Sequence, residues 1–161
     1  TPVETSTGTP SPAGDPTPSP DGPPTLPAAA RGKGARAAKA FVRYYIATMN
    51  HAVATGDTSL VHSLSASDCE SCASVNERIE HVYRSGGHIA SAGWKIMNVR
   101  LVPRQPHRRP LVDVGLELSP QLVIKRAGAS PSRFPGGRMP VTFHLARTSH
   151  GWVVAQWERS A

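Results

Sequence analysis

The spacing of the apolar residues changes at Gly86-Gly87, and this change restricts the fold class more than any other feature of the sequence. Before the glycine pair, apolar residues recur at steps of three and four, which is the spacing of amphipathic helices. After it they alternate with polar residues at a step of two, which is the spacing of half-buried strands. Helices that precede all the strands predict an α+β fold with an antiparallel sheet.

Three helices are predicted before the glycine pair. The first covers residues 37–54, and a short second helix follows over residues 57–64. Asp57 can cap the second helix, because its carboxylate accepts hydrogen bonds from free amides of the first turn. The third helix is predicted to start near Ser67 or Asp68 and to stop at the glycine pair, where glycine adopts the left-handed conformation without strain.

About four antiparallel strands are predicted after the glycine pair. They cover residues 96–101, a long stretch 111–124 that bends at Pro120, and a hairpin of residues 141–145 and 152–158. Residues 127–140 are rich in Gly, Pro and Arg and are predicted to form a long loop. One-sided alternation predicts a curved sheet with helices on one face, an arrangement that resembles the nuclear-transport-factor-2-like cone.

The first 30 residues differ in composition from the rest of the chain. Pro, Thr, Ser, Gly and Ala account for 25 of them, so this stretch cannot bury enough apolar surface to offset its ordering entropy. The predicted organisation is a disordered Pro/Thr/Ser-rich spacer at residues 1–32, followed by a single α+β domain at residues 33–161. The first 30 residues carry three acids and no base, so the charge of +7 becomes +10 for the remainder.

The chain begins with Thr1 rather than Met, and a Pro/Thr/Ser segment at the start of a mature chain is typical of a spacer behind an export signal. An ordinary disordered N-terminus has the same composition. No uninterrupted apolar run approaches the roughly 18 residues of a membrane span. We therefore expect an exported domain that is secreted or held at the outer face of the cell membrane.

Cys69 and Cys72 are the two cysteines of the chain, separated by Glu70 and Ser71. Residues three apart on a helix are close enough for a disulfide, which in so small a ring contributes only about 2 kcal/mol. A thioredoxin-like redox pair would follow a strand within a βαβ pattern, which is not predicted here, and a zinc site would need two more soft ligands. A structural disulfide is the favoured interpretation, and the other two remain open.

A set of short features is shared with a known family over about residues 37–159. The features are Phe41, Tyr44-Tyr45, Asn50, Thr55-Gly56-Asp57, Cys69-Glu-Ser-Cys72, Ile79, Tyr83, Gly86-Gly87, Trp94, Gly151-Trp152 and Trp157. With them the chain resembles a family of surface lipoproteins of unknown function from high-GC Gram-positive bacteria. The resemblance implies a lipid anchor just before Thr1, and it brings no catalytic residues.

No catalytic residue, metal site or cofactor is predicted. No two of the seven histidines are three or four residues apart, the spacing that helical metal sites favour. Asp113 and Glu117 share a strand face opposite the apolar face, so their carboxylates are predicted to point away from the interior. The sequence contains neither a nucleophile elbow nor a Gly-rich phosphate loop.

Basic residues are the chemical excess of the predicted domain. One set, Lys33 to Arg43, lies on a helical face, and two further sets flank the predicted hairpin turn and the long loop. The candidates for anion binding are Arg104, Arg108, Arg109, Arg133 and Arg138. Solvated surface is the default interpretation of any one set, but together the sets favour an anionic partner. For an exported protein the expected partners are anionic lipid head groups or cell-wall polymers rather than nucleic acid.

The sequence therefore predicts a non-catalytic binding or interaction module, tethered outside the cell membrane. The alternative is a small-ligand carrier or enzyme that uses an apolar pocket inside the cone. The candidate lining residues of that pocket are Phe41, Tyr45, Val114, Phe143 and Trp157. Trp152 and Trp157 are an odd number of residues apart, so a regular strand would place them on opposite faces.

Overall fold

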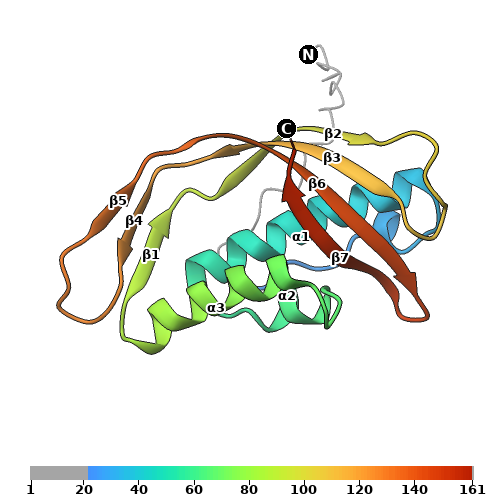
Figure 1. Cartoon of the computed structure of the whole chain (residues 1–161). Coiled ribbons are helices and arrows are strands. Elements are labelled where there is room, and N and C mark those ends of the chain that lie inside the picture. The colour runs from blue at the N-terminus through green and yellow to red at the C-terminus, as the bar shows by residue number, and fades with distance from the viewer. Residues whose placement is uncertain (1–21, 161) are drawn as a thin grey trace, which may run out of the picture.

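The computed structural model describes residues 22–160 and contains three α-helices and seven strands within that range (Figure 1). A short 3-10 helix, η1 (Ala28–Ala30), precedes them. In chain order the elements are α1 (Ala35–Thr55), α2 (Ser59–Ser63), α3 (Glu70–Arg84), β1 (His88–Ser91), β2 (Trp94–Leu101), β3 (Leu111–Leu118), β4 (Gln121–Ile124), β5 (Ser132–Phe134), β6 (Gly137–Thr148) and β7 (Gly151–Arg159).

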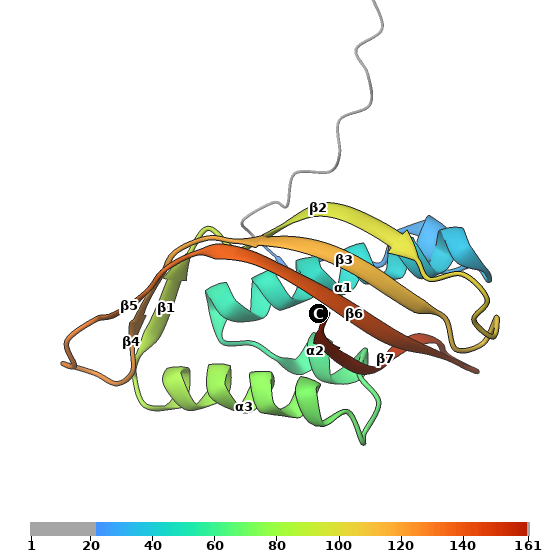
Figure 2. The same ribbon diagram turned by 45° about the horizontal axis from the view of Figure 1, so that its top comes forward.

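The strands form two antiparallel sheets. The longer sheet has the order β2-β3-β6-β7, and the shorter sheet has the order β1-β4-β5. Figure 2 shows α1 beneath the arch of the long strands, with α3 on the side of α1 away from that arch. The predicted α+β fold, with three helices packed on antiparallel sheets in a cone-like arrangement, is confirmed.

The core lies between α1 and the concave face of the longer sheet. Phe41, Tyr45 and Met49, which follow one another at steps of four, are almost completely buried. The ring of Tyr45 meets that of Phe143 on β6 edge to face, with the ring centres 5.9 Å apart. The apolar face that the sequence predicts for the first helix is therefore the face that packs on the longer sheet.

The predicted long strand is divided at Pro120. Residues before it form β3, which pairs with β6, and residues after it form β4, which pairs with β1 in the other sheet. Proline has no N–H for a sheet ladder, and the amide of Ser119 already donates to the carbonyl of Gly93 at 3.1 Å. The predicted loop at 127–140 also differs, because it contains β5 and the start of β6.

The folded part of the chain begins before the predicted domain boundary at residue 33. Ala30 in η1 is buried, and the hydroxyl of Tyr44 on α1 donates to the carbonyl of Pro24 at 3.3 Å. The end of the predicted spacer is therefore packed on α1, because its Leu26 and Ala30 supply apolar surface. The part of the spacer at residues 1–21 lies outside the described residues.

The glycine pair joins α3 to β1 as the sequence predicts. Gly86 has φ of +74°, the left-handed conformation that ends many helices. Gly87 lies so close to β4 that a Cβ placed on it would be 1.9 Å from the carbonyl oxygen of Ile124. Gly86 therefore allows the chain to turn at the end of α3, and Gly87 allows the backbone of this turn to lie close to the backbone of β4.

Cys69 and Cys72 form a disulfide at the start of α3, which confirms the predicted bond. Cys69 is the N-cap of the helix, and its sulfur accepts from the amide of Cys72 at 3.2 Å. Only 2% of Cys69 and 1% of Cys72 are exposed, which keeps both sulfurs away from a second thiol. Burial therefore favours the structural interpretation over a redox role.

Candidate functional site

A concave site with basic walls lies at the end of the molecule where α1 begins (Figure 1). It has a volume of about 780 Å³ and is formed by residues before α1, by the loop between β2 and β3, and by the turn between β6 and β7. We call it the basic pocket. Its lining residues are Lys33, Gly34, His107, Arg108, Arg147, Thr148, Ser149 and Trp152.

Arg147 connects the three walls of the basic pocket. Its amide donates to the carbonyl of Arg108 at 3.0 Å, which holds the β2–β3 loop against β6. Its guanidinium donates to the carbonyls of Gly32 at 3.1 Å and Arg31 at 3.5 Å, just before α1. The charged group is therefore oriented by neutral carbonyls, which leave its positive charge unneutralised.

Trp152 forms the floor behind Arg147. The two residues are paired across the β6–β7 hairpin, and the guanidinium carbon lies 5.2 Å from the centre of the indole ring. The indole N–H donates to the carbonyl of Gly32 at 3.1 Å, and the side chain is buried. A cation–π contact and a shared carbonyl thus hold Arg147 at the pocket.

The start of α1 adjoins the basic pocket, because Lys33 and Gly34 line it. Gly34 is the N-cap with φ of +88°, it has no side chain to cap the helix, and the first turn contains no acid. The amides of residues 35–37 have no acceptor within the helix, and the helix dipole places partial positive charge at this end. The helix therefore adds to the positive potential at the pocket.

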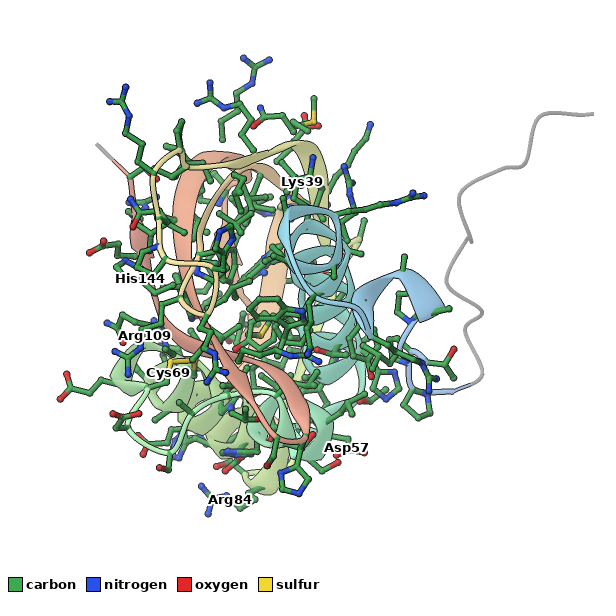
Figure 3. All side chains as sticks on the ribbon, turned by 90° about the vertical axis from the view of Figure 1, so that its right-hand side faces the viewer. Lys39, Asp57, Cys69, Arg84, Arg109 and His144 are labelled. Atoms are coloured by element: carbon green, nitrogen blue, oxygen red, sulfur yellow. A yellow bond between two sulfur atoms is a disulfide. The ribbon has the colours of Figure 1, made fainter. Side chains whose placement is uncertain are left out.

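No carboxylate balances these charges. None of the eight lining residues is acidic. Over residues 22–160 the ion pairs within 4.0 Å are His62 with Glu80 and His144 with Glu158, so neither includes a lysine or an arginine. Within the described residues, therefore, no lysine or arginine has its charge paired with a carboxylate at this distance. Figure 3 faces this end, with Lys39 on α1 and Arg109 on the β2–β3 loop.

The five arginines predicted to bind anions do not form one site. Arg104, Arg108 and Arg109 lie on the β2–β3 loop, whereas Arg133 lies on β5 and Arg138 near the start of β6. Arg138 and Arg147 are nine positions apart, which corresponds to roughly 30 Å along β6. Of the five, only Arg108 lines the basic pocket.

Arg147, which completes the pocket, was not among the predicted residues. The signal was present in the sequence, because the predicted hairpin places Arg147 and Trp152 on either side of a tight turn. An arginine opposite a tryptophan at a hairpin end is a pair that can stack. The contact with residues 31–32 could not be predicted, because the sequence assigned those residues to a disordered spacer.

A second concave region, the apolar groove, lies between α3 and the strands that follow it. Its volume is about 1210 Å³. Most of its charged lining residues come from α3, whereas its apolar lining residues come from α1, α3 and both sheets. The apolar lining residues are Val53, Val75, Ile79, Val82, Ile89, Trp94, Leu118, Val123, Phe134, Pro135, Met139 and Trp157.

The predicted lining of the cone pocket is corrected by the structure. Phe41, Tyr45, Val114 and Phe143 are 2% exposed or less and form the solid core between α1 and the longer sheet. Large side chains on both sides fill that space, so no pocket opens there. Trp157 alone of the five lines the apolar groove.

The expectation that Trp152 and Trp157 face opposite ways is wrong. The pairing of β6 with β7 shifts between His144 and Leu145, so β7 carries an extra residue. Such a bulge reverses the alternation of faces. Trp157 consequently packs on Phe143, with ring centres 6.4 Å apart, on the face where Trp152 is buried.

The polar groups along the apolar groove include two unpaired indole donors and one carboxylate that is already hydrogen-bonded. The indole nitrogens of Trp94 and Trp157 are buried without a hydrogen-bond partner. Glu80 also lines the groove, but its carboxylate accepts hydrogen bonds from Thr58 and His62, which lower the pKa of Glu80. Within the described residues, no three metal-ligating side chains are grouped.

Comparison with known proteins identifies a family and a fold. The model of a family of unknown function, DUF6318, matches residues 8–156. No curated protein matches the chain. Among solved structures, the chain is similar to the crystal structure of the intermembrane space region of the chloroplast protein ARC6, with 12% identity and a TM-score of 0.57. The similarity covers 78% of this chain and 95% of that chain and supports the fold alone.

Two further structures have lower TM-scores. One is a variant titled Rd1NTF2_05, with 8% identity and a TM-score of 0.41 over 74% of this chain and 96% of that chain. The other is a putative calcium/calmodulin dependent protein kinase II association domain from Xanthomonas campestris, with 18% identity and a TM-score of 0.40 over 86% and 93%. Neither carries weight in the functional argument.

Proposed function

The chain belongs to the DUF6318 family of unknown function, and on this premise we propose that it is a non-catalytic binding module for anionic components of the cell envelope. In this proposal the protein is exported, and a lipid anchor upstream of Thr1 holds it at the outer face of the membrane. The resemblance to high-GC Gram-positive lipoproteins motivates the anchor. The observation that carries the binding function is the unneutralised positive charge around the basic pocket.

The charge balance supports an anionic partner. After residue 21 the chain has 18 basic and 8 acidic residues, a net charge of +10. A field of this sign attracts polyanions, and arginine forks match the oxygen pairs of phosphate and carboxylate groups. At a cell surface such groups occur on lipid heads and on wall polymers.

Export is supported by the disulfide and by the spacer composition. Disulfides persist in oxidising compartments and are rare in the cytosol. Among the helices of residues 22–160, none has the length and apolar character to cross a membrane. In our proposal the membrane is reached through the anchor.

The full chain is expected to bind vesicles that contain phosphatidylglycerol and not vesicles of phosphatidylcholine alone. Binding should weaken steeply between low salt and about 1 M salt, where the Debye length is only about 3 Å. Co-sedimentation over a salt series measures this directly. The same series with immobilised poly(glycerol phosphate) shows whether a wall-type polymer binds through the same charges. Vesicle binding that does not change with salt concentration, or equal binding to both vesicle types, argues against the proposal.

A small-ligand carrier is the second candidate function, and the apolar groove favours it. The groove is lined by apolar side chains of both sheets and of α3. A ligand with an apolar body would fit this lining. Phe134, at the edge of the groove, is 47% exposed, which is unusual for a phenylalanine.

The neutral fluorescent probe N-phenyl-1-naphthylamine tests the carrier function, because it has no charge for the basic surface to attract. Phe134→Ser is expected to weaken probe binding roughly tenfold, since an aromatic contact is lost. Met97→Ser is the matched control, because Met97 is 50% exposed but lies outside the groove. Equal probe binding by wild type and both variants would remove the groove from consideration.

A further inference from the structure

Cationic side chains from three distant parts of the chain line the basic pocket. Lys33 precedes α1, Arg108 lies on the β2–β3 loop, and Arg147 lies near the end of β6. Folding therefore brings like charges together, which costs energy unless an anion offsets the repulsion. His107 adds a ring N–H donor and a further charge when it is protonated.

The guanidinium of Arg147 is pre-oriented for an anion. An arginine has five N–H donors, and the two contacts with Gly32 and Arg31 leave part of the fork available. The cation–π contact with Trp152 further restricts the position of the group. Little side-chain freedom is thus lost when an anion binds, which favours affinity.

The start of α1 borders the pocket from another side. A Cβ placed on Gly34 would meet no atom within 4 Å, so there is open space beside this residue. Lys33 and Gly34 line the pocket, and the helical turn that follows them has no side-chain cap. An ammonium and two guanidinium groups thus line one volume next to an uncapped helix start.

We infer that the basic pocket is a binding site for the phosphate group of a larger molecule, held by Lys33, Arg108 and Arg147 beside the uncapped start of α1. This inference rests on the proposed function and names the group that the module recognises. A planar carboxylate is satisfied by one guanidinium fork, whereas a tetrahedral phosphate accepts from donors on several sides. At about 780 Å³ the pocket is large enough to hold more of the ligand than the phosphate itself.

The phosphate could belong to a lipid head group or to a soluble polyol phosphate. Both present the same oxygens, and the structure of the pocket does not depend on which one carries them. Glycerol phosphate in solution and phosphatidylglycerol in vesicles separate the two sources.

Titration of the full chain with glycerol phosphate, followed by amide NMR shifts, tests this site. The largest shifts are expected at residues 33–37 and 147–152, around the pocket. Arg108→Glu is expected to weaken glycerol phosphate binding about tenfold, because reversing one charge at the pocket costs on the order of one close ion contact. Arg138→Glu makes the same charge change roughly 30 Å away along β6 and should leave the affinity within about twofold.

The outcomes separate the site from the wider function. Shifts spread evenly over the basic surface, or equal losses in the two variants, would overturn the phosphate site even if vesicles still bind. Glycerol phosphate binding in the pocket without vesicle or polymer binding would support the site and contradict the envelope function. Glycerol phosphate shifts together with vesicle binding that Arg108→Glu weakens would identify the lipid head group as a source.

Discussion

Gly87→Ala is expected to destabilise the domain by about 3 kcal/mol, at the upper end of the usual cost of overpacking. The added Cβ would lie 1.9 Å from the carbonyl oxygen of Ile124 and within 3 Å of backbone atoms of Lys125 and Arg126. Backbone atoms cannot rotate away as a side chain can, so β4 must move. His88 on β1 pairs with Ile124, and this movement therefore disturbs the first sheet contact after α3.

Chemical denaturation of Gly87→Ala measures this cost as a lower midpoint with an unchanged slope. Gly137→Ala is the matched control, because a Cβ there would meet no atom within 4 Å. Its stability should stay within about 0.5 kcal/mol of the wild type. If Gly87→Ala is as stable as Gly137→Ala, then the α3–β1 turn does not pack closely on the backbone of β4.

The helical half of the fold could be predicted from local patterns because its contacts repeat along the sequence. The four-residue steps of Phe41, Tyr45 and Met49 identify the buried face of α1, and the structure buries all three. The glycine pair marks the end of α3 for a local reason as well, since Gly86 adopts a positive φ. These features need no knowledge of distant residues.

The sheet could be predicted only in part because its register depends on partners far along the chain. Pro120 predicts a bend within one strand, but in the structure the chain passes at this residue from the longer sheet to the shorter one. The bulge in β7 has no local signal, and it reverses the face of Trp157. A cavity expected among Phe41, Tyr45 and Phe143 is instead solid core.

The residues of the basic pocket could also be predicted only in part. Positive charge was visible in the composition, and Arg108 was correctly placed on a loop between strands. The pocket itself depends on contacts of Arg147 with residues 31–32, which are more than a hundred positions away. Only the folded chain shows which basic residues share one concave surface.

The double variant Lys33→Glu/Arg108→Glu is expected to bind phosphatidylglycerol vesicles at least about 100-fold more weakly than the wild type at low salt. Each basic residue close to an anionic surface contributes about 1 kcal/mol, and charge reversal replaces that attraction by repulsion. Two reversals at the pocket therefore exceed the roughly 2.8 kcal/mol that a 100-fold change requires. Both side chains are exposed, so the fold should tolerate the changes.

The double variant Arg133→Glu/Arg138→Glu is the control with the same change of net charge. These arginines are also exposed. Arg138 lies at the end of β6 away from the pocket, and Arg133 lies on β5. Net charge alone would weaken both double variants equally, whereas a localised binding surface would not. Denaturation midpoints of the two variants verify that each is folded.

The ratio of the vesicle affinities of these two double variants is the most direct test of binding through the α1 end of the domain. We predict that the control binds at least about tenfold more tightly than Lys33→Glu/Arg108→Glu, since only the latter changes the basic pocket. Equal affinities would contradict the account, because they would show that the vesicles respond to total charge and not to the pocket.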